Sequence, residues 1–318
     1  MSRSRFLGGR YWGILLRGMG MGAADVVPGV SGGTIAFITG IYGELLDSLS
    51  RIGPHCVTIL RRHGPLVAWR YINGNFLLAL FCGILLSVFS LANLIGFLLD
   101  KYPIVVWSFF FGLILASTVP ILRQVPRWTW SVPVCLLLGV LLAVGVSEIR
   151  PGQVPATPLT LFLSGALAIC AMILPGISGS FILLMIGIYP RVLEAVHELQ
   201  WENLLFFAGG AVTGLMLFSR LLSWLMHHYP ARTLAFLAGV LLGSLKIVWP
   251  WKLPDAGTAG GDKLAPLLSN VLPARFAGET GAEPFVVPAL VAAAAAVALV
   301  LLVDHVGRVR DPREQGKA

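Results

Sequence analysis

Charged residues are scarce in this sequence. They make up 12% of the 318 residues, against about 25% in an ordinary soluble protein, while 57% are hydrophobic. This scarcity excludes a single soluble domain, because about 20 consecutive apolar helical residues are enough to cross a bilayer. The sequence therefore predicts a protein that crosses a membrane several times, with uncharged runs at residues 26–43, 71–99, 102–122, 128–147, 151–190, 203–219 and 284–303.

Motifs for metals, disulfides and nucleotides are also missing. The four cysteines lie far apart without CxxC spacing, which indicates small buried side chains. The motif GxxxxGK(S/T) is absent, which argues against an ATP-driven pump. The N-terminal residues lack the features of a secretory signal, so we expect the first hydrophobic segment to belong to the fold. We expect no cofactor, no metal and no nucleic-acid partner, and we attribute the net charge of +8 to cytoplasmic loops.

The sequence does contain an internal repeat. Residues 28–42 (PGVSGGTIAFITGIY) and 175–189 (PGISGSFILLMIGIY) are identical at 8 of 15 positions without a gap. Further along, KYP at 101–103 matches HYP at 228–230, so the offset falls from 147 to 127 residues. A repeat of this kind determines how the whole fold is organised.

We therefore divide the chain into a first repeat, residues 1–150, and a second repeat, residues 151–318, within a single membrane domain. The change of offset places a longer loop, basic and polar, at residues 51–75 of the first repeat. Each repeat also contains three long apolar segments. The spans are predicted at residues 76–99, 104–121 and 131–147, and at 204–226, 232–249 and 284–303.

The segments beside each PG turn are too short to cross the membrane. Residues 180–189 are only ten, and as a helix they rise about 15 Å, half of the hydrocarbon core. A re-entrant hairpin fits better than two full spans. Each repeat crosses an odd number of times with or without the hairpin, so the two must be inverted. The predicted fold is an all-α integral membrane protein of two inverted-topology repeats, each a re-entrant or broken helix hairpin plus three transmembrane helices.

Loop charges predict how the chain is oriented. With the N-terminus inside, fifteen Lys and Arg residues fall on the inner side and six on the outer side. Because positive loops stay in the cytoplasm, both termini are expected there. Inverted repeats with broken helices are typical of secondary transporters, whose substrate site lies near the middle of the membrane.

The two PG turns are the strongest candidates for a binding site. Proline and glycine end one helix and leave backbone amides free at the start of the next, which favours binding of an anion. Such a turn must be buried in protein or line a wet cavity. We expect phosphate or carboxylate to bind there; the alternative is that the small residues only allow close packing and capping. The predicted site comprises Ser31, Gly32, Gly33, Thr34, Ser178, Gly179 and Ser180.

Five ionisable residues in or beside apolar runs complete the prediction. Asp25, three residues before the first PG turn, is a candidate proton carrier or cation ligand, or else a local partner of Arg17 or a capping acid. Arg220, within a predicted span, is a candidate counter-charge for the substrate, or else extends to the inner surface. Glu44 and Arg191 occupy equivalent repeat positions and are candidate gates or plain surface residues, and Lys246 is a candidate gate or an interfacial anchor.

Residues 18–46 (GMGMGAADVVPGVSGGTIAFITGIYGELL) and 173–193 (ILPGISGSFILLMIGIYPRVL) closely resemble the polyprenyl-phosphate or undecaprenyl-phosphate transporter family PopT, formerly a bacterial membrane family of unknown function. The resemblance implies that undecaprenyl phosphate is returned from the outer to the inner leaflet of the bacterial cytoplasmic membrane, in support of cell-wall polymer synthesis. It also implies coupling to an ion gradient, with protons as the expected ion.

Residues 28–34 also resemble part of the PGxSRSGxT loop of undecaprenyl-pyrophosphate phosphatases. The phosphate-holding arginine of that loop is replaced by Gly32, and by Gly179 in the second copy. Neither copy has the glutamate-rich catalytic helix of those enzymes beside it, so little transition-state charge could be stabilised. We therefore expect a transporter without catalytic residues. The alternatives are a lipid-pyrophosphate phosphatase and a transporter of a small soluble anion.

Overall fold

The computed structural model describes residues 3–27, 29–148, 154–155, 157–254 and 268–310. Pro28 of the first PG motif and the predicted repeat boundary at residues 150 and 151 lie outside the described residues. Within them the regular secondary structure is helical apart from one antiparallel pair of short strands, β1 (Lys252–Pro254) and β2 (Leu268–Asn270). The prediction of an all-α membrane protein is confirmed.

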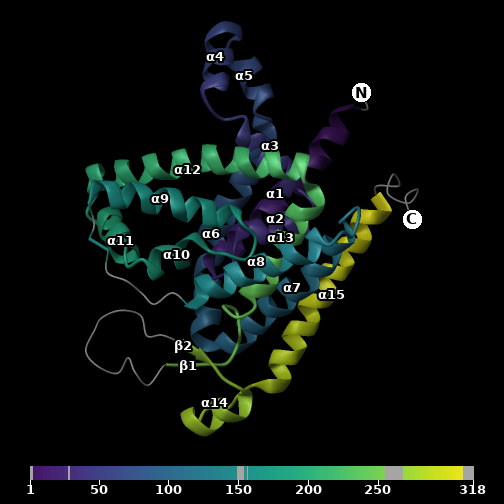
Figure 1. The fold of residues 1–318 in the computed structure, drawn as a ribbon, viewed down its shortest axis with the longest axis vertical. Helices are drawn as coiled ribbons and strands as arrows, with labels where there is room; N and C mark the ends of the chain where they lie inside the picture. Colours follow the sequence, from purple (N-terminus) through teal and green to yellow (C-terminus); the bar gives the residue numbers. More distant parts are fainter. Residues whose placement is uncertain (1–2, 28, 149–153, 156, 255–267, 311–318) are drawn as a thin grey trace.

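Helices account for most of the described chain (Figure 1). In the first half they are α1 (Arg3–Val26), α2 (Gly32–Ile38), α3 (Tyr42–Ser50), α4 (Pro54–His63), α5 (Pro65–Tyr71), α6 (Gly74–Lys101), α7 (Pro103–Arg123) and α8 (Ser131–Glu148). In the second half they are α9 (Pro158–Ile173), α10 (Gly179–Met185), α11 (Tyr189–His197), α12 (Trp201–His228), α13 (Pro230–Ser244), α14 (Pro273–Thr280) and α15 (Val286–Arg310).

Five of these helices, α6, α7, α8, α12 and α15, are long and apolar enough to span a membrane. The predicted span at 232–249 is wrong in its extent, because α13 ends at Ser244 after 15 residues and the chain then turns. The predicted longer connection at 51–75 is present, and it contains two short helices, α4 and α5. Each of these two short helices has proline in its first turn, where the missing amide costs no hydrogen bond.

The two halves of the chain contain matching helices. Helices α2 and α10 both have 7 residues, α3 and α11 both have 9, and α6 and α12 both have 28. The end of the 28-residue helix is also alike in the two halves. Tyr102 (φ −135°, ψ 50°) and Tyr229 (φ −133°, ψ 53°) each precede a proline that begins the next helix. These matches follow the sequence repeat, while the inverted orientation of the halves stays a prediction.

The halves are interlocked through their last helices. Helix α8 of the first half packs against α13 of the second, and α15 of the second half packs against α7 of the first (Figure 1). Glycines allow the close approach: Gly139 lies against the backbone of Phe236, and Gly112 against that of Ala293. Neither half therefore has a complete set of packing partners by itself.

The outer surface of the helices is apolar over long stretches. Phe89 of α6 is 80% exposed and Leu205 of α12 is 70% exposed, and many leucines on the same helices are also exposed. The interior contains small hydroxyl residues among its apolar side chains, including the fully buried Ser87 and Ser219. This distribution fits a protein that is surrounded by lipid.

Candidate functional site

The chain reverses direction at each PG turn. Gly18 of α1 lies against Leu80 of α6, and Gly22 of α1 lies against Ile84 of α6. Both contacts advance by four residues in the same direction along the two helices, so α1 and α6 run parallel. Two neighbouring parallel helices require the chain between them to return to the side where it started. This return passes through α2 to α5, while the re-entrant character of the hairpin stays a prediction.

The second half is built in the same way. Gly210 of α12 lies against Phe162 of α9, and Gly214 lies against Ala166, so α9 and α12 also run parallel. The return passes through α10 and α11, which are bent by 109° relative to each other. In each turn a glycine has the positive φ angle that other residues avoid, +81° at Gly29 and +91° at Gly176.

The structure brings the two turns into direct contact. Ser31 Oγ donates to the carbonyl of Met172 at 2.8 Å, and the amide of Gly176 donates to Thr34 Oγ1 at 3.0 Å. The hydroxyl of Tyr42, at the start of α3, donates to the carbonyl of Ile173 at 3.1 Å. Residues about 130–140 positions apart in the sequence therefore form one site between the two halves.

Ser31 and Thr34 act within this contact. Ser31 is fully buried, its single proton is donated to Met172, and its oxygen also accepts from the amide of Gly33 at 3.1 Å. Thr34 is fully buried as well. These hydroxyls hold the turns together and saturate backbone groups that would otherwise be unpaired. Whether they also contact a phosphate stays a prediction.

Replacing Ser31 with alanine is expected to destabilise the protein. The change leaves the Met172 carbonyl and the Gly33 amide without their buried partner, which costs about 1–3 kcal/mol for each such group. Thr39→Ala is the matched control, because the Thr39 hydroxyl bonds the carbonyl of Ile35 within its own helix. Thermal unfolding in detergent should show a lower midpoint for Ser31→Ala than for Thr39→Ala; equal midpoints would contradict the role of Ser31 in joining the turns.

At the first turn, neighbouring atoms lie so close to the backbone that a side chain would not fit, which is why glycine occurs there. A Cβ on Gly32 would lie 2.6 Å from Asp25 Oδ2, and one on Gly33 would lie 2.8 Å from the Ile173 carbonyl oxygen. In the second turn a Cβ on Gly179 would lie 2.5 Å from the carbonyl oxygen of Ala168. The glycines thus allow two broken helices to approach each other and the helices that precede them.

Ser178 and Ser180 differ from their counterparts in the first turn. Their hydroxyls lie 2.8 Å apart, Ser178 is 5% exposed, and the side chain of Ser180 is exposed. No side chain caps α10, whereas Ser31 caps α2. Ser180 is therefore a member of the predicted phosphate site that a ligand can reach without separating the turns.

Asp25 lies at the end of α1, beside the first turn. Its Oδ1 accepts from the amide of Gly32 at 2.7 Å, at the start of α2. Within the described residues it makes no ion pair, so the nearby Arg17 is not its partner. The equivalent position in the second half is Met172, which is 39% exposed. The two turns therefore differ chemically, because among the described residues only the first has a partly buried carboxylate beside it, and this carboxylate has no cation as partner.

Arg220 is placed at α3 and not at the turns. Its Nε donates to the carbonyl of Ser50 and its Nη2 to that of Ile52, both at 3.1 Å. These carbonyls lie at the C-terminal end of α3, where a cation is favourable. The guanidinium therefore joins α12 to α3, and the predicted contact with substrate charge stays a prediction.

Asp47 makes a second connection between α3 and α12. Ser223 Oγ donates to Asp47 Oδ1 at 2.7 Å, and His227 Nε2 lies 3.9 Å from Asp47 Oδ2. The equivalent helices, α11 and α6, make no comparable contact in the described part of the chain. The flank between α3 and α12 is therefore packed more closely than the matching flank between α11 and α6.

The other predicted gating residues form separate contacts. Glu44 binds Arg10 at 2.6 Å and accepts from Asn73 at 2.9 Å, so it ties α3 to α1 and to the start of α6. Arg191 binds Glu194 within α11 at 2.9 Å and is exposed. Lys246 pairs with Glu148 at the end of α8. None of the three lies at the turns.

Lys252 is a residue that the sequence analysis missed. Its ammonium group lies 4.4 Å from the centre of the Trp107 ring and donates to the carbonyl of Ile247. Trp107 and Ile247 in turn lie against Gly29 in the first PG turn. Burial lowers the pKa of Lys252 from 10.5 to about 8. Its position among Trp249, Trp251 and Pro254 was a signal of burial in the sequence.

Comparison with known proteins identifies the family. Residues 21–260 match the model of the VCA0040-like family, described as undecaprenyl phosphate translocase-like. The chain belongs to this family. It is 48% identical over 293 residues to a protein of Vibrio cholerae named polyprenyl-phosphate transporter, covering 92% of this chain and 95% of the relative. It is 34% identical over 258 residues to a protein of the same name from Staphylococcus aureus, covering 75% of this chain and 86% of the relative.

No solved structure matches the chain. The family model covers both PG turns, Arg220 and Lys252, so the site described above lies within the matched region. Within the described residues, no group of three or more His, Cys, Asp or Glu side chains is placed to hold a metal ion. The central site consists of backbone groups, hydroxyls and one carboxylate.

Proposed function

We propose that this protein moves polyprenyl phosphate from one leaflet of the membrane to the other. The contact between the two broken-helix turns carries the proposal, because it forms a polar site within an apolar helix bundle. The relatives of this chain, which are named polyprenyl-phosphate transporters, support it as well. A transported lipid needs such a site for its headgroup alone. The polyprenyl chain stays in the surrounding lipid while the headgroup crosses.

The phosphate binds on the face of the turns that carries Ser178 and Ser180. The exposure of Ser180 supports this placement, since the hydroxyls of Ser31 and Thr34 are used between the turns. Gly32, Gly33 and Gly179 give the close backbone approach that a phosphate requires. Separation of the turns during transport would free Ser31 and Thr34 to bind the same headgroup.

Asp25 couples transport to protons. A carboxylate beside the substrate turn, without a cation among the described residues, can bind a proton and release it when the site changes sides. The direction in our proposal is from the outer to the inner leaflet of the bacterial cytoplasmic membrane. Both termini face the cytoplasm, which the excess of basic residues on that side supports.

The flank between α3 and α12 is the gate that is closed in this structure. Arg220, Asp47 and Ser223 join these helices, while the equivalent flank between α11 and α6 is packed less closely. Inverted repeats exchange such arrangements during transport, because each repeat can take the conformation of the other. Docking of α11 on α6 would accompany release of α3 from α12.

Two substitutions of Arg220 distinguish a charge that acts on the substrate from a side chain that links α12 to α3. Arg220→Gln is expected to slow transport several-fold, and Arg220→Lys is expected to be nearly as slow, because lysine cannot reproduce the two hydrogen bonds to Ser50 and Ile52. Transport in reconstituted vesicles is the measurement. If Arg220→Lys transports as the wild type does, the charge acts on the substrate and the role as a link to α3 is contradicted.

A lipid-pyrophosphate phosphatase and a transporter of a soluble anion are the competing functions. The replacement of arginine by Gly32 and Gly179 supports transport without catalysis. Release of inorganic phosphate from lipid pyrophosphate by the purified protein, lost on mutation of Ser31, would establish the phosphatase instead. Uptake of inorganic phosphate into vesicles at a rate that lipid phosphate does not inhibit would establish the soluble-anion transporter.

A further inference from the structure

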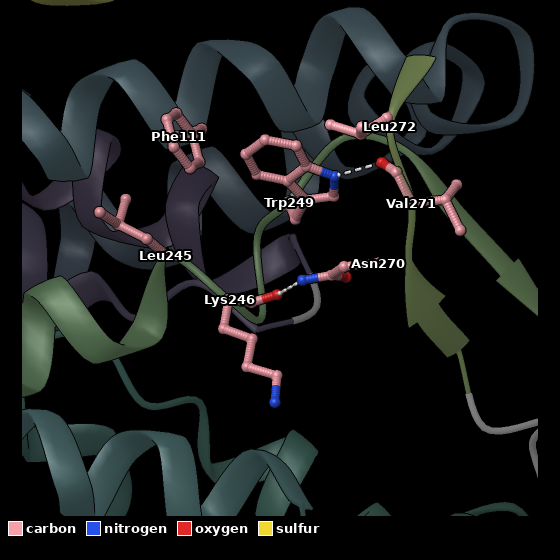
Figure 2. Close-up of a pocket in the computed structure, with 7 residues that line it drawn as sticks. All are labelled: Phe111, Leu245, Lys246, Trp249, Asn270, Val271 and Leu272. Carbon is pink, nitrogen blue, oxygen red and sulfur yellow. Dashed lines mark hydrogen bonds between the residues drawn. The ribbon is translucent and has the colours of Figure 1, made fainter. Parts of the chain in front are cut away.

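A pocket of about 420 Å³ lies beside the β1–β2 pair (Figure 2). It is bounded by α7, by the segment that follows α13 and by β2 with the residues after it. Its volume lies within the range of about 300–1,000 Å³ that is usual for small-molecule sites. The lining residues are Phe111, Leu245, Lys246, Trp249, Asn270, Val271 and Leu272.

One end of the pocket is apolar and held in place. Phe111 and Trp249 meet edge to face at 5.6 Å, and Trp249 Nε1 donates to the carbonyl of Val271 at 2.9 Å (Figure 2). Val271 belongs to a buried cluster with Trp251, which itself bonds the carbonyl of Pro284. The aromatic wall is therefore formed before any ligand binds.

A cation lies below the lower edge of the pocket (Figure 2). The side chain of Lys246 extends from the lower edge of the pocket, away from Leu272 (Figure 2). Asn270 Nδ2 donates to the backbone carbonyl of Lys246 at 2.8 Å. Its ammonium group pairs with Glu148, and the two side chains are 43% and 62% exposed. Ion pairs as exposed as this contribute about 0–1 kcal/mol, so Lys246 can exchange its partner at little cost.

We propose that this pocket is a docking site for the head end of a polyprenyl phosphate before it reaches the turns. The phosphate replaces the Glu148 carboxylate on Lys246, and the first isoprene units lie against Phe111 and Trp249. The rest of the chain leaves past Leu272, which is 69% exposed. The inference rests on the proposed function and adds to it a second binding site with its own residues.

Charge and shape together select this ligand. The pocket lining is mostly apolar, so inorganic phosphate would leave the wall of Phe111, Trp249 and Leu272 unused. A polyprenol would contact that wall but has no anionic group to pair with Lys246. A phosphate monoester carries about 1.5 to 2 negative charges, more than the single carboxylate that it replaces. An amphiphile with an anionic head uses both ends of the pocket.

Two substitutions with opposite effects test the proposal. Binding of a polyprenyl phosphate of three isoprene units to the purified protein in detergent is measured by calorimetry. Lys246→Gln should weaken binding about tenfold, because a charge-assisted hydrogen bond is lost. Glu148→Gln should tighten it several-fold, because the phosphate no longer competes with a carboxylate. Lys101→Gln, at an exposed lysine that ends α6, is the control and should bind as the wild type does.

The outcomes also separate the docking site from the proposed function. If Lys246→Gln and Glu148→Gln both bind as the wild type does, the proposal is overturned, and wild-type transport in vesicles would still support the proposed function. Binding of inorganic phosphate or of the matching alcohol as tightly as the lipid phosphate would overturn it too. Opposite shifts in the two variants with no transport by the wild type would support the pocket and count against the function.

Discussion

Replacing Asp25 with asparagine is expected to reduce proton-driven transport of polyprenyl phosphate at least tenfold. Asparagine has nearly the same size and can still accept from the amide of Gly32, so the turn keeps its hydrogen bond. It cannot take up and release a proton, which is the role that we assign to Asp25. The initial transport rate in vesicles with an imposed pH gradient is the measurement.

The control for this substitution is Asp100→Asn, because Asp100 is an exposed acid near the end of α6. We expect Asp100→Asn to transport at the wild-type rate. We also expect Asp25→Asn to lose its response to the direction of the pH gradient, which a merely unstable variant would keep in its residual activity. A wild-type response in Asp25→Asn would contradict proton coupling through this residue.

Replacing Gly210 with alanine is expected to destabilise the protein more than any other glycine-to-alanine substitution at the interface between α9 and α12. The added Cβ would overlap the carbonyl oxygen of Phe162, which is backbone and cannot move away without separating α9 from α12. Overpacking of this kind costs about 1–3 kcal/mol, and a rigid neighbour places the effect at the upper end. The thermal unfolding midpoint in detergent should fall by several degrees.

The neighbouring residue provides the control. A Cβ on Gly209 would lie 3.7 Å from the Phe162 ring, an ordinary contact. Alanine is favoured over glycine within a helix by about 1 kcal/mol, so Gly209→Ala should leave the midpoint unchanged or raise it. If the two variants unfold at the same temperature, the close parallel packing of α9 and α12 is wrong.

Much of the fold follows from local sequence patterns. The apolar runs predict the helices that cross the membrane, and the repeated PG motif predicts two broken helices at matching positions. The exchange of α8 and α15 between the halves could not be predicted, because it depends on which distant glycine faces which backbone. The end of α13 at Ser244 was missed because the sequence stays apolar beyond it.

The site was predictable in its residues and less so in its contacts. The sequence shows that Ser31 and Thr34 are hydroxyl residues at a helix start, but their partners, Met172 and Gly176, lie in the other half of the chain. Arg220 was chosen because a charge in a span is costly, a rule that does not say which carbonyls it binds. Lys252 was overlooked because its contact with Trp107, which is far away in the sequence, arises only in the fold.

Leaflet-to-leaflet movement of polyprenyl phosphate in vesicles tests the central claim most directly. The lipid is supplied to the outer leaflet, and its loss from that leaflet is followed by adding a phosphatase that acts only outside. Vesicles with the wild-type protein should protect the lipid phosphate faster than empty vesicles and faster than vesicles with Asp25→Asn. If correctly folded wild-type protein protects the lipid no faster than empty vesicles, this protein does not translocate polyprenyl phosphate.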